Sequence, residues 1–176
     1  MCLVDKFSLE GSRILIRPVT RKDLERLHIW WNDGRIMASV GYPDGLGISM
    51  ANMLTCWKRW KNDPLRLMKI ICLKPDLSPI GESNFHDYKP DEGIIQIGLK
   101  ICNPELWGQG LGTETLRLMV DFAFSELKVN RVLINPAKTN ARIIRVNEKV
   151  GFKPTGEDKG GLLMELRRRE WLLKKI

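Results

Sequence analysis

A glycine-rich turn that opens directly into an amphipathic helix carries the clearest chemical signal of the chain. It reads Trp107-Gly-Gln-Gly-Leu-Gly-Thr-Glu114. Gly108, Gly110 and Gly112 permit backbone torsions that a side chain forbids, so successive backbone amides can point at one anion at the helix N-terminus. The amides that we expect to hold a pyrophosphate belong to Gln109, Gly110, Leu111, Gly112 and Thr113.

Two familiar phosphate-binding motifs do not fit this turn. A P-loop continues with Gly-Lys and then Ser or Thr, whereas no lysine lies in this turn. A dinucleotide-binding turn follows the first strand of its unit and precedes an acidic residue by about 20 positions. Here the turn lies past the middle of the chain, and Asn135-Pro136 follows the next expected strand. The turn therefore belongs to another class of phosphate cradle.

A second motif follows, Asn140-Ala-Arg-Ile-Ile-Arg-Val-Asn-Glu-Lys-Val-Gly-Phe152, which reads as a helix closed by Gly151. With both motifs in this order, the chain resembles the GNAT superfamily of acetyl-CoA-dependent N-acetyltransferases. The form of the glycine turn is similar to that of the ribosomal-protein and small-amine acetylating branches. The resemblance covers nearly the whole chain. It implies one N-acetyltransferase domain over residues 1–176, with acetyl-CoA as co-substrate and no metal.

The implied GNAT fold is α/β (α+β), with a central, twisted, mixed but mostly antiparallel sheet of about six to seven strands and about four flanking helices. Periodicity and turn residues predict elements in the same order. Strands are expected at residues 7–10, 13–19, 67–73, 80–88, 94–101 and 131–135, and residues 153–175 should hold one or two more, with 162–166 the better candidate. Helices are expected after Thr20, which forms a capping box with Asp23, after Ser49, and at residues 112–127 and 141–150.

The resemblance also assigns contacts with acetyl-CoA. In the family, a backbone amide binds the acetyl carbonyl where the fourth long strand separates from the fifth, and the corresponding amides here run from Leu99 to Ile101. Asn140 matches the family asparagine that hydrogen-bonds the pantetheine arm. Alternatively, Asn140 only caps the helix that follows it.

The general base is less direct to assign. Many relatives carry a glutamate where this chain has Gln96, and an amide takes up no proton at neutral pH. Strand alternation places Glu82, Asn84 and His86 on one face, with Asp87 on the other. We expect Glu82 or His86 to act as the base through water. The alternative is that both residues only decorate a face of the sheet.

Asn147 stands where the family places the tyrosine that protonates departing CoA. Asparagine cannot supply that proton, but it can donate a hydrogen bond, and a thiol with a pKa of about 8.5 leaves tolerably without an acid. We therefore expect a catalytic site with an altered acid position. The alternative is a catalytically weak CoA-binding or regulatory module, because Gln96 and Asn147 both replace reactive family residues.

Composition and charge limit the partners. The chain has 176 residues, 43% of them hydrophobic, and a formal net charge of +8, part of which can attract the anionic CoA. No apolar run is long enough to cross a membrane and no signal-peptide core is seen, so we expect a cytoplasmic protein with no membrane partner. The basic residues are spread without a recognisable nucleic-acid motif, so no nucleic acid is expected. A monomer and a homodimer both remain compatible.

The resemblance implies that the acceptor is a primary amine, on a small molecule, an amino sugar or a protein N-terminus. A chain this basic is poorly matched to polycations such as polyamines and aminoglycosides, although local acidic residues can overrule the global charge. Trp30, Trp31 and Tyr42 either line the acceptor cleft or pack in the core.

The cysteines indicate thiols and no metal site. Cys2, Cys56, Cys72 and Cys102 form no Cys-x-x-Cys pair, and the chain has two histidines. Cys102 as an acyl-carrying nucleophile is a further alternative, although no histidine lies near it in the sequence.

Overall fold

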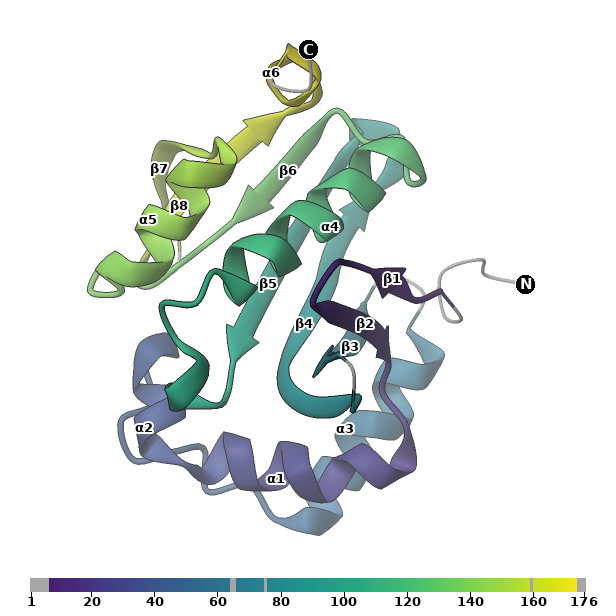
Figure 1. Ribbon diagram of the computed structural model, residues 1–176, viewed down its shortest axis with the longest axis vertical. Coiled ribbons are helices and arrows are strands. Elements are labelled where there is room, and N and C mark those ends of the chain that lie inside the picture. Colours follow the sequence, from purple (N-terminus) through teal and green to yellow (C-terminus); the bar gives the residue numbers. More distant parts are fainter. Residues whose placement is uncertain (1–6, 64–65, 75, 159, 174–176) are drawn as a thin grey trace.

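A computed structural model describes residues 7–63, 66–74, 76–158 and 160–173. Within these residues eight strands form one sheet, in the order β1-β2-β3-β4-β5-β6-β8-β7. All neighbouring strands are antiparallel except β5 and β6, which are parallel. The strands, seen in Figure 1, are β1 (Leu9–Glu10), β2 (Ile14–Pro18), β3 (Leu67–Leu73), β4 (Ser78–Lys89), β5 (Ile94–Ile101), β6 (Arg131–Ile134), β7 (Lys153–Asp158) and β8 (Gly161–Arg167).

The four expected helices begin and end at or close to the residues that the sequence marks. In the Thr20–Asp23 capping box the Asp23 carboxylate accepts from Thr20 N at 2.7 Å, and Ser49 Oγ caps the third helix by accepting from Asn52 N at 3.2 Å. Gly151, with a φ of 121°, follows the fifth helix. The described α-helices are α1 (Leu24–Asn32), α2 (Gly34–Met37), α3 (Met50–Asn62), α4 (Leu111–Ser125), α5 (Ala141–Val150) and α6 (Arg168–Leu173).

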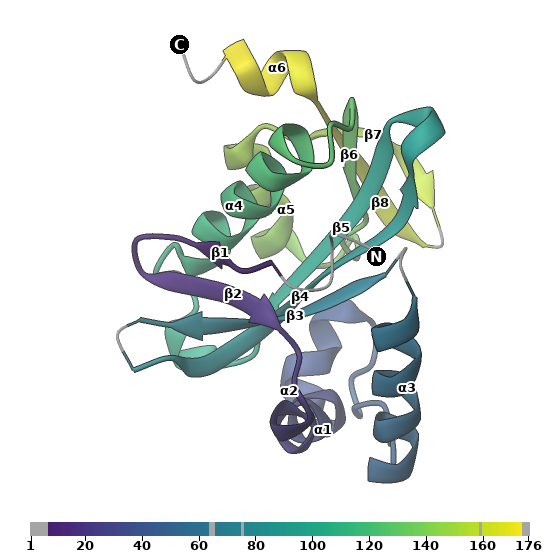
Figure 2. The ribbon, with the colours of Figure 1, turned by 90° about the vertical axis from the view of Figure 1, so that its right-hand side faces the viewer.

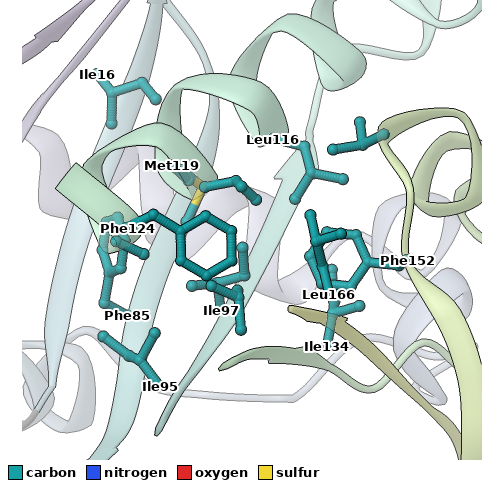
Figure 3. Packing of buried hydrophobic residues seen from close by; sticks show 14 of the residues in the cluster. Ile16, Phe85, Ile95, Ile97, Leu116, Met119, Phe124, Ile134, Phe152 and Leu166 are labelled. Atoms are coloured by element: carbon teal, nitrogen blue, oxygen red, sulfur yellow. The ribbon is translucent and has the colours of Figure 1, made fainter. Parts of the chain in front are cut away.

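The sheet carries a hydrophobic core on each face. Figure 2 shows α4 and α5 on one side of the strands and α1, α2 and α3 on the other. On the first side, Met119 and Phe124 of α4 lie over Ile95 and Ile97 of β5, and Leu116 lies toward Phe152 and Ile134 (Figure 3). On the second side, a smaller cluster joins α1 and α3 to β3. Because both faces are covered, the central strands are fixed from both sides, and the site they carry is held in place.

The predicted fold class is confirmed, but the expected numbers of strands and helices were slightly low. Residues 153–158 form β7 although five of their six side chains are exposed and no apolar alternation marks them. This segment is a strand because it pairs with β8. The short helix α2 follows Asp33, whose side chain accepts from Arg35 N, and it is too brief to show a periodic pattern. The sequence left open whether residues 153–175 hold one strand or two, and it gave no signal for α2 or α6.

Strands β5 and β6 separate in the middle of the sheet (Figure 1). They pair over only three residues, with Ile94 opposite Arg131 and Gln96 opposite Leu133. Beyond that point β5 continues to Ile101 beside β4 alone, whereas β6 ends at Ile134. The sheet therefore opens where the N-terminus of α4 begins, as the resemblance implied.

Candidate active site

A cleft of about 700 Å³ occupies the place where β5 and β6 separate. One wall is formed by β5 and the glycine turn, and the other by the end of β6 and by α5. Residues 39–41, which follow α2, also line the cleft. The cleft therefore joins the segments that carry both sequence motifs.

The glycine turn presents backbone amides to this cleft. Gly108 and Gly110 have φ values of 80° and 81°, in the left-handed region that only glycine adopts freely. The first backbone bond at the start of α4 runs from Glu114 N to Gly110 O at 3.0 Å. In the part of the chain that the structure describes, the preceding amides of the turn donate to no backbone carbonyl. They are the unsatisfied donors of a helix N-terminus, where an anion binds.

Gly112 differs from the other two glycines, because its φ is ordinary. A Cβ atom there would lie 3.8 Å from Leu99 Cδ1 and 3.9 Å from Ile101 Cγ1, which is normal contact distance. The expectation that all three glycines need special torsions is therefore wrong for Gly112. Gln109 stabilises the turn through its side chain, which donates to Glu105 O at 2.9 Å.

The β1–β2 hairpin is tied to the glycine turn by Glu114. Its carboxylate accepts from Ser12 Oγ at 3.1 Å, Arg13 N at 2.8 Å and Arg13 Nε at 2.9 Å. Arg13 also donates to Gln109 O at 2.8 Å. Burial opposes ionisation of Glu114, but the hydrogen bonds from Arg13 and Ser12 outweigh it and lower its pKa. The negative charge of Glu114, which lies beside the anion site, is therefore neutralised by Arg13.

Three basic side chains of α5 line the opposite wall: Arg142, Arg145 and Lys149. The guanidinium of Arg142 stacks on Trp107, with its Cζ 3.7 Å from the ring centroid, and so joins the two walls. Desolvation lowers the pKa of Arg142. Trp107 is fixed in turn, because its Nε1 donates to Ile101 O at 2.7 Å. This end of the cleft is therefore positively charged.

The predicted contacts of the acetyl and pantetheine groups also lie in the cleft. Leu99 and Ile101 line it from β5, and Asn140 lines it from the start of α5. The side chain of Asn140 caps α5 by accepting from Ile143 N at 3.2 Å, and it donates to Ser39 O at 3.1 Å. The capping alternative is therefore observed, while the contact of Asn140 with pantetheine stays a prediction.

Asn147 lies outside the cleft. Its side chain is 0% exposed, and Asn147 is not one of the described residues that line the cleft. Its Nδ2 lies 3.6 Å from Met164 Sδ, and its Oδ1 has no hydrogen-bond partner among the described residues. The family tyrosine at this position protonates departing CoA, but the Asn147 side chain contacts Met164 of β8 and so does not match that role.

Of the two candidate bases, Glu82 has both oxygens engaged. Its Oε1 lies 3.0 Å from Lys100 Nζ, and its Oε2 accepts from Trp31 Nε1 at 2.7 Å. The Glu82 and Lys100 side chains are only 9% and 11% exposed. Both oxygens of this buried carboxylate are therefore occupied by other side chains, and neither is free to contact a substrate amine.

His86 is better placed for this task. It lines the cleft, and its Nδ1 lies 2.9 Å from Asp87 Oδ2. An aspartate at Nδ1 favours the tautomer with a proton on that nitrogen, which leaves Nε2 able to accept one. Asp87 reaches its neighbour because β4 bulges between His86 and Lys89, and Asp87 adopts a φ of 50°. Strand alternation alone had placed Asp87 on the opposite face; the bulge corrects this expectation.

Comparison with known proteins identifies the family. The acetyltransferase (GNAT) domain model matches residues 13–153. The chain belongs to the GNAT acetyltransferase family. It is thus an acyltransferase, and its eight-stranded, mostly antiparallel sheet is the GNAT sheet.

Among relatives of this GNAT acetyltransferase, an N-acetyltransferase 9-like protein of Nematostella vectensis is 23% identical over 167 residues, covering 89% of this chain and 83% of the relative. A kanamycin resistance protein of Rhizobium radiobacter is 35% identical over 66 residues, which are 38% of this chain and 61% of that protein.

Two solved structures share the fold. An aminoglycoside acetyltransferase in complex with coenzyme A has a TM-score of 0.79 at 23% identity, with 93% of this chain and 99% of that chain covered. A spermidine N-acetyltransferase of Vibrio cholerae, in complex with CoA and spermine, has a TM-score of 0.80 at 17% identity, with 92% and 99% covered.

Two further expectations concern side chains outside the GNAT cleft. Cys102 is buried and is not among the described residues that line the cleft, and burial together with the charge of Glu82 raises its pKa, which disfavours the thiolate that an acyl carrier needs. Trp30 is buried in the core and Trp31 is held by Glu82, whereas Tyr42 is exposed; none of the three belongs to the described lining.

In the described ranges, no helix has the length and apolarity that a membrane span requires.

Proposed function

We propose that this protein is a single-domain, cytoplasmic N-acetyltransferase of the small-amine type, which transfers the acetyl group of acetyl-CoA to a primary amine within a ternary complex. The observation that carries the proposal is one cleft with free helix-start amides at one end and His86 at the other. The names of the kanamycin resistance protein and the spermidine N-acetyltransferase point to amines as well.

The residues present fit coenzyme A. Its pyrophosphate matches the amides of Gln109 to Thr113, which lie at the N-terminus of a 15-residue helix. Its remaining negative charge matches the basic side chains that α5 places on the facing wall. When bound, acetyl-CoA supplies an activated thioester. Leu99 and Ile101 line the cleft where β5 and β6 separate. We propose that a backbone amide of this segment donates a hydrogen bond to the acetyl carbonyl.

We assign the general base to His86 and the task of holding its tautomer to Asp87. The amine nitrogen attacks the acetyl carbonyl carbon, the carbon–sulfur bond breaks, and its electron pair leaves with the sulfur. The excess proton of the amine passes to His86 Nε2, directly or through one water. Glu82 has another task, because Lys100 and Trp31 occupy its oxygens.

Two measurements test the proposal. Acetyl-CoA should raise the melting temperature, since it binds only the folded chain, and neither ATP nor NAD should match it. A panel of primary amines should then release free CoA at a rate that saturates with amine concentration. If acetyl-CoA binds but no amine of the panel increases the release of CoA, the transferase function is contradicted and a CoA-binding module is favoured.

A matched pair of variants tests the cradle itself. Gly110→Val should abolish the shift in melting temperature, because valine is strained at a φ of 81°. Gly156→Val is the control: a Cβ atom at Gly156, on the exposed strand β7, meets nothing within 4 Å, so the shift should stay. An unchanged shift in Gly110→Val would show that the phosphates bind elsewhere.

A further inference from the structure

Three cross-strand pairs form one face of the cleft. Glu82 lies opposite Lys100, Asn84 opposite Gly98, and His86 opposite Gln96. All six residues line the cleft, so they share the face of the sheet that opens into it. We call these six residues the β4–β5 ladder.

The β4–β5 ladder offers no free negative charge to a second cation. Glu82 is the one carboxylate among the described lining residues, and Lys100 neutralises it at 3.0 Å. The other charged lining side chains are the basic ones of α5, and His86 is neutral when it serves as base. A second ammonium group entering this cleft would lose water and gain no counter-charge, which is costly.

The middle of the β4–β5 ladder holds an unused hydrogen-bond acceptor. Asn84 Oδ1 is buried and has no partner among the described residues. Gly98 lies opposite it and places no side chain against this oxygen, whereas a Cβ atom at Gly98 would lie 3.2 Å from it. A buried acceptor without a partner is costly unless a ligand satisfies it. An amine N–H satisfies it, and His86 stands two residues along the same strand.

We propose that the β4–β5 ladder is the acceptor subsite and that it selects amines with a single positive charge and an otherwise uncharged body. Asn84 Oδ1 accepts one N–H of the nucleophile and orients its lone pair, while His86 takes the excess proton. The inference rests on the proposed N-acetyltransferase function. It separates this chain from relatives named for kanamycin and spermidine, both of which are polycations.

The test compares kcat/KM within matched pairs of amines that differ in charge: 4-amino-1-butanol against 1,4-diaminobutane, glucosamine against kanamycin, and a neutral-bodied peptide N-terminus against a lysine-rich one. The singly charged member should be favoured at least about tenfold, because the second cation is desolvated without a partner. Equal or better turnover of the polycations overturns the inference and leaves the proposed function standing. No acetylation of any amine overturns the proposed function, and the inference with it.

Lys100→Gln tests the charge argument separately. It releases the carboxylate of Glu82, so the ratio of kcat/KM for 1,4-diaminobutane over 4-amino-1-butanol should rise about tenfold. Lys74→Gln is the matched control, because Lys74 pairs with Glu10 outside the cleft at 2.7 Å and its loss should not move the ratio. A ratio unchanged in Lys100→Gln contradicts the role of the Glu82–Lys100 pair.

Asn84→Ala tests the hydrogen bond. It should raise the KM for the amine and lower kcat while the KM for acetyl-CoA stays constant, and Asn84→Gln should restore part of the loss. Asn84→Asp keeps the size of the side chain and should shift preference toward the diamine. Full activity in Asn84→Ala, or an equal change in both KM values, contradicts the assignment.

Discussion

At the scale of single residues, the pair His86 and Asp87 combines two departures from regular strand geometry. Asp87 is one of three non-glycine residues with positive φ in the described ranges, and it lies at the bulge in β4. Strain of this kind persists where the surrounding structure enforces it and often marks functional sites. Here it turns a carboxylate toward the histidine beside it, with Asp87 Oδ2 2.9 Å from His86 Nδ1.

His86→Gln should therefore lower kcat by about a hundredfold or more, the usual contribution of a general base, with the KM for acetyl-CoA unchanged. Asp87→Asn should have a smaller effect, since the imidazole stays in place and only its tautomer is less favoured. Steady-state kinetics at saturating acetyl-CoA measure both. A loss below about threefold in His86→Gln would assign the proton to another group.

Asn147 leads to the opposite expectation. Its side chain is packed against Met164 and lies away from the cleft, so Asn147→Ala should leave turnover within about threefold. Replacement by tyrosine, the family residue, should lower the melting temperature, because a fully buried site has no room for a larger ring. A hundredfold loss of turnover in a folded Asn147→Ala variant would show that this residue reaches the reaction.

At the scale of elements, the β1–β2 hairpin and α4 form one unit around the glycine turn. Their contacts join residues about a hundred positions apart: Ser12 and Arg13 bind Glu114 on α4, and Arg13 binds the turn at Gln109. Gly11 permits this approach, because a Cβ atom there would lie 2.6 Å from Glu114 Oε1. The hairpin therefore holds the turn in the shape that exposes its amides.

Glu114→Ala should weaken acetyl-CoA binding by about tenfold, because a hydrogen bond to a charged group contributes about 1.5–3 kcal/mol and part of this holds the turn. The KM for the amine should not change. Glu126→Ala is the control, at the other end of the same helix. Titration calorimetry with acetyl-CoA gives the affinities, and equal values for wild type and Glu114→Ala would contradict the bracing role.

The turn before α1 adds a test by pH. Asp23 is buried and paired with Arg17 at 2.7 Å. Burial opposes its ionisation, but hydrogen bonds from Arg17 and Thr20 outweigh it and lower its pKa. A lowered folded-state pKa means that the stabilisation is present above the unfolded-state value and is lost as pH falls through the folded-state value.

Asp23→Asn should therefore cost about 1.5–3 kcal/mol at pH 7, and the difference from wild type should shrink as the medium is acidified below about pH 4. Urea unfolding at several pH values measures it. A difference that is independent of pH would mean that the Asp23 carboxylate does not carry this stabilisation.

At the scale of the whole molecule, the sequence carried the parts of the site that depend on local backbone. The turn before α4 and the boundaries of α5 were predicted because glycine torsions and helix caps are local properties. The direction of Asn147, the pairing of Glu82 with Lys100 and the bracing by Glu114 were not predicted. These depend on strand register and on contacts between distant segments, which single-sequence periodicity does not report. The bulge at Asp87 left no signal in the sequence, since strand alternation runs through it unbroken.

The central claim is that the cleft brings acetyl-CoA and an amine together for direct transfer. The most direct measurement uses acetyl-CoA with an isotopically labelled acetyl group and follows the label by mass spectrometry in the presence of 4-amino-1-butanol, glucosamine or a peptide with a free N-terminus. The label should appear on the amine nitrogen in amounts equal to the free CoA released, and His86→Gln should slow both equally. Label found only in free acetate would contradict this claim.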